Sequence, residues 1–525
     1  MIRYPSRRKH ETNVTNYENL RYSNPSPLNT DLSNNISKLK KILGNSNDIV
    51  VRNIKLHTES LQKIAIVYID GISKEDIIDK HIMEPLLKYN FQCDKSTLSS
   101  SMIIDLEQII TASHLKRGVS WNDVISAILS GDTTVFLDGY QQALIVSTKE
   151  PQARNITEPT TQTVIRGPKD SFTENFRTNT GLIRSRIQNP NLQLETIKVG
   201  EITQTDIGLM YIRGLADPSI LKEIKNRLQQ ITIDGILESS YIEEFIRDNQ
   251  FTPFPTILNT ERPDAVTANL LEGRIAIIVH GTPYVLIGPA TFIQFFQSPE
   301  DYYQHQYISS FLRMLRFGTF IVSFLVPSLY IAVVSHHQGL IPTVLLVSLA
   351  AQREGVPFPQ IVEALIMELT FEVLREAGIR MPRAVGQALS IVGALILGQA
   401  AVQAGFVSAA IVIIVSITGI SSFALPNYNV GIVSRLLRFL MLIAGAFIGL
   451  YGIVLALLVI ILHMCSLRSF GVPYLAPLAP FRLDEQKDTL VRFSINSLIK
   501  RPSPAISQNK IRTKGHNIDG NENEK

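Results

Sequence analysis

Apolar positions divide this chain into a mixed first part and a second part dominated by hydrophobic runs. In the first part, short apolar stretches alternate with amphipathic ones, a pattern that predicts the strands and helices of a water-exposed fold. Four later runs are long enough to cross a bilayer at about 1.5 Å per residue, namely 317–334, 384–402, 406–424 and 439–463. Buried helices of a large soluble protein are the alternative, but several uncharged runs of about 18 residues favour membrane spans.

Arginines set the expected topology of these runs, because positive flanks favour the cytoplasm. The flanking pairs are Arg313 with Arg316, Arg380 with Arg383, and Arg435 with Arg438. A further apolar run, 340–351, is too short to span alone and is expected as a half-span or re-entrant segment. The basic C-terminal tail also favours the cytoplasm, which requires an even number of crossings. The proline-rich segment 467–482 is therefore expected to re-enter the membrane or to fold back along its surface.

Two pairs of matching landmarks suggest that the water-exposed part is a duplicated module. The stretches KIAIVYIDGI and DIGLMYIRGL place Tyr68 and Tyr211 143 residues apart. Gly139 and Gly281, each in a strand-turn-strand pattern, are 142 residues apart. The nearly equal spacing predicts two copies of an α/β module, each with an early strand, amphipathic helices and a final hairpin. Two unrelated strand-turn-strand motifs are the alternative.

The predicted fold class is α+β and membrane α-helical: a duplicated cytoplasmic α/β module followed by a helical transmembrane domain. Tails rich in Asn, Ser and charge are expected to be disordered, and a stretch rich in Pro, Thr and Gln is expected to be a linker. The predicted parts are a disordered tail over 1–45, a first subdomain over 46–148, a linker over 149–164, a second subdomain over 165–300, a transmembrane domain over 301–482 and a largely disordered cytoplasmic tail over 483–525.

Charge and cysteine content narrow the class of protein further. The 525 residues include 50 basic and 46 acidic side chains, a net charge of +4, and this balance gives no reason to expect a nucleic-acid partner. Two cysteines, Cys93 and Cys465, cannot build a disulfide framework. The basic N-terminus has no apolar core behind it, so no cleavable signal peptide is expected.

No motif in the sequence predicts catalysis. A Walker A loop, a G-x-S-x-G elbow, an H-E-x-x-H pair and paired C-x-x-C motifs are all absent from the sequence. His336 and His337 are adjacent, so they face different directions on a helix, and no third ligand lies nearby in the sequence. We expect them to be an interfacial pair, and we expect no enzyme activity, no cofactor and no metal.

The segment between the apolar runs carries a set of acids that forms the candidate functional region. The candidate pore or gate residues are Val362, Glu363, Glu368, Glu372 and Glu376. In a helix that begins after Pro359, the last three lie at i, i+4 and i+8 on one face, and Glu363 points away from them. Such carboxylates must face water, a cation or a basic partner, and around an oligomer they would form acidic rings that select cations. The alternative is a solvated face paired locally with Arg375 and Arg380.

Aromatic side chains crowd the stretch just before the first long run. They are Phe292, Phe295, Phe296, Tyr302, Tyr303, Tyr307 and Phe311. Rings with an apolar body suit the membrane–water boundary, and packing in a protein core is the alternative.

Small residues recur along two of the apolar runs. The candidate helix-packing residues are Gly386, Ser390, Ala394 and Gly398, which follow one another every four residues, and Gly445 with Gly449 in a G-x-x-x-G pattern. Small faces let helix backbones approach closely. They are expected to pack helices within one chain or between the chains of an oligomer.

Five long stretches, in order along the chain, point to a known family. They are GPKDSFTENFRTNTGLIRSRI (167–187), ERPDAVTANLLEGRIAIIVHGTPYVLIGPATFIQFFQSPEDYY (261–303), REGVPFPQIVEALIMELTFEVLREAG (353–378), SFALPNYN (422–429) and RSFGVPYLAPLAP (468–480). These stretches resemble the A subunit of GerA-type spore germinant receptors. The resemblance leaves out only the two tails. Where the family often has an acid in the second hairpin, this chain has His280.

The resemblance implies a multi-pass protein of the spore inner membrane with its N-terminal domain on the cytoplasmic, spore-core side. It implies two partners, a transporter-like B subunit that senses the nutrient and a lipoprotein C subunit, and it implies no enzymatic activity. It also implies that the chain oligomerises, in contact with membrane lipid, into a ligand-gated cation channel.

Two other functions remain open at this stage. A non-conducting membrane scaffold, similar to the related accessory protein of the dipicolinate channel operon, would assemble without conductance. A solute permease is less well supported, because transporters usually show two repeated sets of long spans, whereas the repeat here lies in the water-exposed half.

Overall fold

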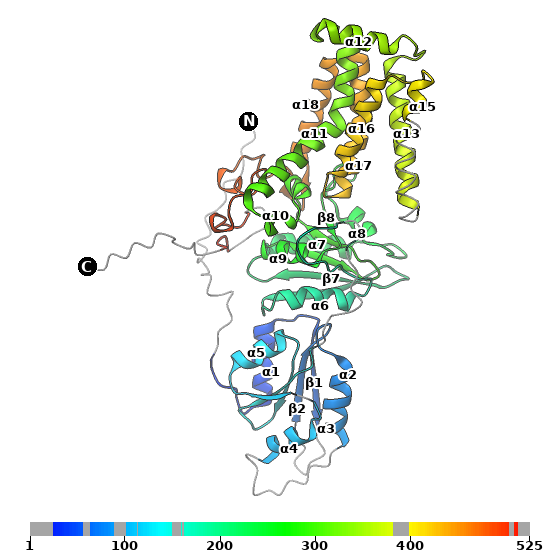
Figure 1. The fold of residues 1–525 in the computed structure, drawn as a ribbon. Coiled ribbons are helices and arrows are strands. Elements are labelled where there is room, and N and C mark those ends of the chain that lie inside the picture. The colour runs from blue at the N-terminus through cyan, green and yellow to red at the C-terminus, as the bar shows by residue number, and fades with distance from the viewer. Residues whose placement is uncertain are drawn as a thin grey trace, which may run out of the picture.

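The structure is a computed structural model and describes residues 25–55, 63–88, 101–112, 114–149, 159, 162–381, 398–502 and 509–512. Two α/β subdomains and a bundle of long helices follow one another along the long axis of the molecule (Figure 1). The second subdomain lies between the first subdomain and the bundle.

The first subdomain is a five-stranded antiparallel sheet with helices on both faces. Its elements are α1 (Leu32–Leu43), β1 (Ile49–Lys55), β2 (Lys63–Ile69), α2 (Glu75–Ile77), the π-helix η2 (Ile78–Met83), α3 (Glu84–Lys88), α4 (Ser101–Ile109), β3 (Leu115–Gly118), α5 (Trp121–Leu129), β4 (Thr133–Leu137) and β5 (Ala143–Val146). The strand order is β1-β2-β4-β5-β3. Alternate residues of β2 enter two separate cores, one on each face, because successive side chains of a strand point to opposite sides.

The second subdomain has the same strand order in its own sheet, β6-β7-β9-β10-β8. Its elements are α6 (Phe176–Arg186), β6 (Leu192–Val199), β7 (Thr205–Ile212), α7 (Pro218–Gln229), α8 (Ser239–Ile246), β8 (Leu258–Thr260), α9 (Pro263–Leu271), β9 (Ile275–Val279) and β10 (Val285–Gly288). The sequence landmarks occupy matching places in the two sheets. Tyr68 and Tyr211 lie in β2 and β7, and Gly139 and Gly281 lie in the two hairpin turns with φ of 87° and 90°.

The expected N-terminal tail contains an ordered helix, α1, so the first subdomain begins before residue 46. Leu32, Leu39 and Leu43 of α1 are buried with Trp121 in the core on one face of the first sheet. Asp31 accepts the backbone N–H of Ser33 and caps the helix. Polar composition indicated disorder, but an apolar stripe at helical spacing is enough to dock a helix. Residues 1–24 lie outside the described residues.

A buried ion pair joins the two subdomains. The guanidinium of Arg184 on α6 donates to the carboxylate of Asp48 at 2.7 and 3.0 Å and to the hydroxyl of Ser46 at 2.8 Å. Both charged side chains are buried, with exposed fractions of 1% and 0%. Gln193 adds a hydrogen bond of 2.8 Å to the carbonyl of Leu43. These contacts fix the relative orientation of the subdomains.

The helical part contains α10 (Glu300–Tyr303), α11 (Gln306–His336), α12 (Thr343–Arg353), α13 (Gln360–Arg380), α15 (Gly398–Gln403), α16 (Ala409–Phe423), α17 (Tyr428–Ile448) and α18 (Leu450–Ser466). Among the described helices, α11 and α17 are long and apolar enough to cross a membrane, by length and composition. The helix α12 lies at the end of the bundle far from the sheets (Figure 1). The second predicted run, 384–402, lies mostly outside the described residues.

The run 439–463 was predicted as one span, and this prediction is wrong. Gly449, with a φ of +69°, ends α17 and begins α18, and the two helices pack side by side as a hairpin. Hydropathy cannot detect such a turn, because the residues on both sides of Gly449 are apolar. The imidazole of His336 contacts the Ala446 carbonyl at 2.7 Å, and the Leu450 N–H donates to His337 at 3.3 Å. The histidine pair therefore holds this turn.

Core packing accounts for three of the seven aromatic side chains of the predicted cluster, whereas Tyr307 and Phe311 lie in α11 and are exposed. Phe292, Phe295 and Phe296 are buried with Tyr474 between the second sheet and the base of the bundle. Because Tyr474 lies in the segment 467–482, that segment folds back onto the second subdomain and the base of the bundle. It contains the short hairpin β11 (Arg468–Ser469) and β12 (Val472–Pro473).

The C-terminal segment 483–502, expected as a disordered tail, also packs on the protein. The carboxylate of Asp488 accepts from Arg313 on α11 at 2.7 Å and from the Tyr302 hydroxyl at 2.8 Å. Arg492 is buried and donates to the carbonyl of Gln304 at 3.0 Å. These contacts fasten the segment to the base of α11. Residues 503–508 and 513–525 lie outside the described residues.

Candidate functional site

The predicted acids lie on α13, which packs against α16 and α17. Glu368 forms an ion pair with Arg438 of α17, and both side chains are buried, at 0% and 1% exposed. A second guanidinium nitrogen of Arg438 donates to the carbonyl of Ser323 on α11 at 2.7 Å. The pair therefore ties three helices together at one level of the bundle.

Glu372 lies one turn further along α13 and contacts two arginines. Its carboxylate is 3.1 Å from Arg435 of α17 and 3.5 Å from Arg375 of α13. The guanidinium of Arg375 lies over the rings of Phe371 and Phe423, 4.9 and 5.1 Å from their centroids. We call Glu368, Glu372, Arg375, Arg435 and Arg438 the charged seam. Arg435 and Arg438 were expected on a cytoplasmic flank, but they lie inside α17.

Glu363 lies apart from the charged seam, as predicted, but it is fully buried. Its carboxylate pairs with Arg353 at 3.3 Å and accepts the backbone N–H of Ser408 at 3.0 Å. Ser408 is the N-cap residue of α16, so the acid satisfies a free N–H at the positive end of that helix. Glu363 is therefore placed to hold α13 against α16.

Glu376 and Val362 complete the predicted set and do not join the charged seam. Glu376 pairs with Arg380 one turn away, and its side chain is 58% exposed. Val362 is half-buried in the first turn of α13. The stripe of three acids therefore separates in the folded chain. Each step of four residues along an α-helix turns the side chain about 40° further round the helix axis. Glu368 and Glu372 therefore contact the arginines of α17, whereas Glu376 points further away and pairs with Arg380.

The charged seam has unmet hydrogen-bonding capacity. Among the described residues, four buried polar atoms of the seam make no hydrogen bond: Glu368 Oε1, Glu372 Oε1, Arg375 Nε and Arg438 Nη2. Buried polar atoms usually find a partner, so these four atoms make the seam costly to keep in an apolar bundle.

The predicted packing residues have different roles. Gly386, Ser390 and Ala394 lie outside the described residues. Gly398 is the first residue of α15. A Cβ atom added there would lie 3.5 Å from the Val412 side chain, an ordinary van der Waals contact, so no close helix approach requires this glycine. At Gly445, a Cβ atom would lie 2.8 Å from the carbonyl oxygen of Ser328, so α17 and α11 approach closely there. Gly449 serves the turn before α18.

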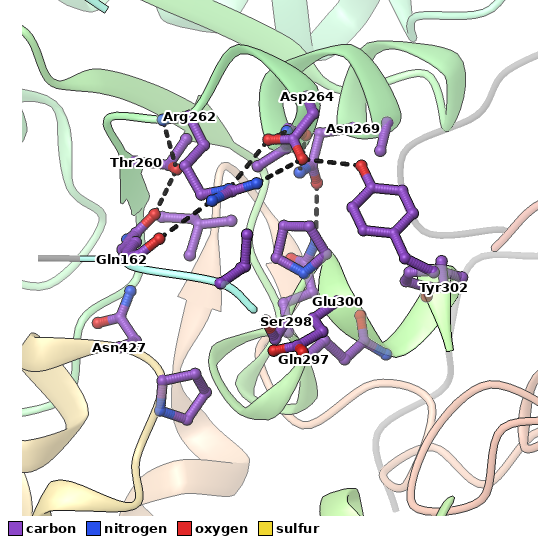
Figure 2. A pocket seen from close by; sticks show the side chains of 18 of the residues that line it. Gln162, Thr260, Arg262, Asp264, Asn269, Gln297, Ser298, Glu300, Tyr302 and Asn427 are labelled. Carbon is purple, nitrogen blue, oxygen red and sulfur yellow. Dashed lines mark hydrogen bonds and ion pairs between the residues drawn. The ribbon is translucent and has the colours of Figure 1, made fainter. Parts of the chain in front are cut away.

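A cavity of about 480 Å³ lies where the second subdomain, the bundle and the C-terminal segment meet (Figure 2). Its walls come from α9 and its flanks, from α10 and the base of α11, from the turn between α16 and α17, and from Ile495, Leu498 and Arg512. The cavity therefore borders the second subdomain, the base of the bundle and the C-terminal segment.

Arg262 and Asp264 form the polar centre of the cavity wall (Figure 2). Arg262 donates to the Asp264 carboxylate at 2.7 and 3.0 Å and to the carbonyls of Gln162 and Pro168 at 3.1 and 2.9 Å. The hydroxyl of Tyr303 donates to Asp264 at 2.8 Å. Burial, together with the nearby Asp264 carboxylate, raises the pKa of Tyr303. Through Arg262, these contacts hold Gln162, near the end of the predicted linker, against the second subdomain.

Glu272 and Arg512 also line the cavity, and charges there link the end of α9 to the C-terminal part of the chain. Glu272 lies 3.6 Å from Arg274 and 4.0 Å from Arg512. Burial raises the pKa of Glu272 and lowers the pKa of Arg274. Arg501 donates to the carbonyl of Leu271 at 2.9 Å.

Asn427 connects the cavity to the charged seam. Its side chain caps α17 by accepting the N–H of Asn429 at 3.0 Å, and α17 carries Arg435 and Arg438. The cavity therefore borders the first turn of the helix that pairs with α13. Motif analysis missed Arg262 and Asp264, although both lie in the stretch 261–303 that carried the family resemblance.

In the part of the chain that the structure describes, no group of three His, Cys, Asp or Glu side chains could hold a metal ion. The charged seam places two carboxylates against three guanidinium groups, and the cavity wall pairs Arg262 with Asp264. These ion pairs hold helices and chain segments together.

Comparison with known proteins gives a consistent family assignment. A family model described as "Bacillus/Clostridium GerA spore germination protein" matches residues 37–504. The chain is 48% identical to spore germination protein KA of Bacillus subtilis, over 93% of this chain and 89% of that protein. It is 39% identical to spore germination protein GerLA of Bacillus cereus, over 89% of this chain and 94% of that protein.

Two further similar proteins are a membrane protein and a solved N-terminal domain. The uncharacterized membrane protein YfkQ of Bacillus subtilis is 43% identical, over 91% of each chain. A crystal structure of the N-terminal domain of the A subunit of the Bacillus megaterium spore germinant receptor GerK3 is 42% identical in sequence. It covers 52% of this chain and 100% of that chain, with a TM-score of 0.41.

Proposed function

Since this chain belongs to the GerA family of spore germination proteins, we propose that it is the A subunit of a germinant receptor in the spore inner membrane. Its bundle crosses the membrane several times, oligomerises and forms a ligand-gated cation channel. The two subdomains, which arose by duplication, lie on the cytoplasmic side. A transporter-like B subunit and a lipoprotein C subunit complete the receptor, and the chain itself catalyses no reaction.

The observation that carries this proposal is the charged seam inside an apolar bundle. Charged side chains at membrane depth are costly, so they usually mark an ion path, a sensor or another functional site. Here Glu368 and Glu372 pair with arginines of the next helix while several of their polar atoms stay unsatisfied. Because several polar atoms of the charged seam lack hydrogen-bond partners, a second arrangement of the helices could give these atoms new partners.

The geometry suggests how α13 gates the path. One face of α13 carries Glu368 and Glu372 against α17, and another presents Leu369 and Val373, which are 56% and 68% exposed. In the closed state the arginines neutralise both acids and the apolar face borders the path. Rotation of α13 about its axis would release the acids from Arg435 and Arg438 and turn carboxylates toward a passing cation.

Ion flux through the purified chain in liposomes tests this proposal. Glu368→Gln with Glu372→Gln removes both seam acids, and Glu376→Gln serves as the matched control because that acid lies on the same helix outside the seam. We expect the double variant to change cation over anion permeability several-fold and the control to match the unaltered chain. Unchanged selectivity in an assembled, conducting double variant contradicts the proposed path.

A non-conducting scaffold is the second candidate, and one observation favours it. Every acid of the predicted set is held by an ion pair within one chain, as a purely structural ion-pair network would be. A scaffold assembles without flux. If the chain forms oligomers by light scattering but stays silent even with the B and C subunits present, the scaffold is the better assignment.

A further inference from the structure

An exposed apolar surface lies at the base of α11, where the C-terminal segment packs beside it. Tyr307 and Phe311 of α11 are 73% and 62% exposed, and Val491 and Phe493 of the C-terminal segment are 41% and 48% exposed. We call these four side chains the basal apolar surface. Exposed groups of large apolar side chains usually mark a contact with a partner or a membrane.

Two contacts hold the basal apolar surface together. The hydroxyl of Ser310 donates to the carbonyl of Arg492 and accepts its N–H, each at 3.0 Å. Arg313, one turn further along α11, pairs with Asp488 at 2.7 Å. Phe311 and Phe493 are the chain neighbours of Ser310 and Arg492, so helix and segment present their apolar side chains from one fastened unit.

The length of α11 places this surface relative to a bilayer. The helix has 31 residues and is about 46 Å long at about 1.5 Å per residue, whereas the hydrocarbon core is about 30 Å thick. Roughly ten residues must therefore lie outside the hydrocarbon. Arg313 and Arg316 pair with Asp301 near the start of the helix, so the first turns are the part that stays outside. Aromatic side chains favour that depth.

A basic side chain accompanies the surface. Lys487 is exposed, and its carbonyl accepts the N–H of Phe493 at 3.0 Å. An exposed lysine in the same segment as exposed aromatic side chains matches the chemistry of the lipid headgroup region, where phosphates lie above the first methylenes of the acyl chains. The surface is continuous with α11, whose apolar turns lead directly into the bilayer.

We propose that the basal apolar surface rests in the headgroup region of the membrane and that the C-terminal segment is thereby a membrane-contacting strap. This inference depends on the membrane placement given under the proposed function. The strap anchors α11 at the bilayer surface through Ser310 and Arg313. The contact is with lipid, because the same face of the helix continues into the hydrocarbon.

Fluorescence quenching by brominated lipids tests the contact in the full chain reconstituted in vesicles that contain anionic lipid. Phe311→Trp and Phe493→Trp each report on the surface. Leu455→Trp, at an exposed position of α18, is the control for membrane insertion. Leu87→Trp, at an exposed position of α3, is the control for a site far from the membrane. The native Trp121 is fully buried and contributes a constant background.

We expect strong quenching at 311 and 493 when the bromines lie near the carbonyl end of the acyl chain, and weaker quenching when they lie near the methyl end. Position 455 should be quenched, and position 87 should not. Quenching at 455 without quenching at 311 and 493 overturns the strap contact and leaves the membrane placement intact. No quenching at 455 overturns the membrane placement, and the strap contact with it.

Discussion

Glu368 of α13 and Arg438 of α17 form a fully buried ion pair, and Arg438 also donates to the backbone of α11 through Ser323. The two residues are 70 positions apart in the chain. Their pairing holds the face of α13 that carries Glu368 against α17. The orientation of α13 is therefore set by charge as well as by apolar packing.

Removing one member of this pair should destabilise the bundle. Arg438→Met leaves Glu368 buried without its partner, and loss of one partner of a buried pair costs about 3–5 kcal/mol. We expect a lower melting temperature of the full chain in detergent. Replacing both residues, with Glu368→Leu added, should restore much of the loss. A single variant as stable as the unaltered chain shows that the pair is not formed.

A methyl group at Gly445 should separate α17 from α11. The new Cβ would lie 2.8 Å from the Ser328 carbonyl oxygen, and overpacking of this kind costs about 1–3 kcal/mol. Gly431→Ala is the matched control on the same helix, because its Cβ would be 3.9 Å from the nearest atom, the Ser422 carbonyl oxygen. Thermal unfolding in detergent should rank Gly445→Ala below the control, and equal stability contradicts the close approach.

The link between the subdomains rests on Arg184. Arg184→Met leaves the buried carboxylate of Asp48 without its cation and should cost about 3–5 kcal/mol. Arg186→Met provides the comparison, because Arg186 pairs with Asp170 at a partly exposed site, where ion pairs contribute about 0–1 kcal/mol. Chemical unfolding of the two variants measures the difference. Similar losses of unfolding free energy in the two variants indicate that the buried Arg184–Asp48 pair contributes no more than the partly exposed Arg186–Asp170 pair.

Glu243 should make the stability of the second subdomain depend on pH. Burial, with a smaller contribution from Glu238, raises its pKa from 4.5 to about 7, against the opposing effect of Arg247. The folded chain therefore holds a proton that the unfolded chain has lost, so the free energy of unfolding falls as pH rises from about 4.5 to about 7. Glu243→Gln should flatten this slope in melting temperatures taken across that range. Glu244→Gln, at the exposed neighbour, should retain it.

The C-terminal segment should detach when Asp488 loses its charge. Asp488→Asn weakens the contacts to Arg313 and Tyr302, and a hydrogen bond to a charged group contributes about 1.5–3 kcal/mol. Limited proteolysis should then cleave the segment several-fold faster than in the unaltered chain. Lys487→Gln changes an adjacent exposed residue and should leave the rate unchanged. Equal cleavage of both variants contradicts the role of Asp488.

Sequence alone determined the features that depend on local pattern. Apolar runs predicted helices that the structure places in α11 and α16, and strand alternation with glycine turns predicted two similar sheets at matching landmarks. The segment around Glu368 was predicted to be the functional region, because several acids between apolar runs are costly wherever they lie, and this role stays a prediction.

Tertiary structure alone decided which charges meet and where chain segments return. The sequence gives no distance between Glu368 and Arg438, and the partner of a buried charge is set by the packing of helices. The turn at Gly449, the docking of α1 and the return of residues 483–502 to α11 were missed for the same physical reason. Each depends on a few long-range contacts, and local composition carries no information about contacts between residues far apart in the chain.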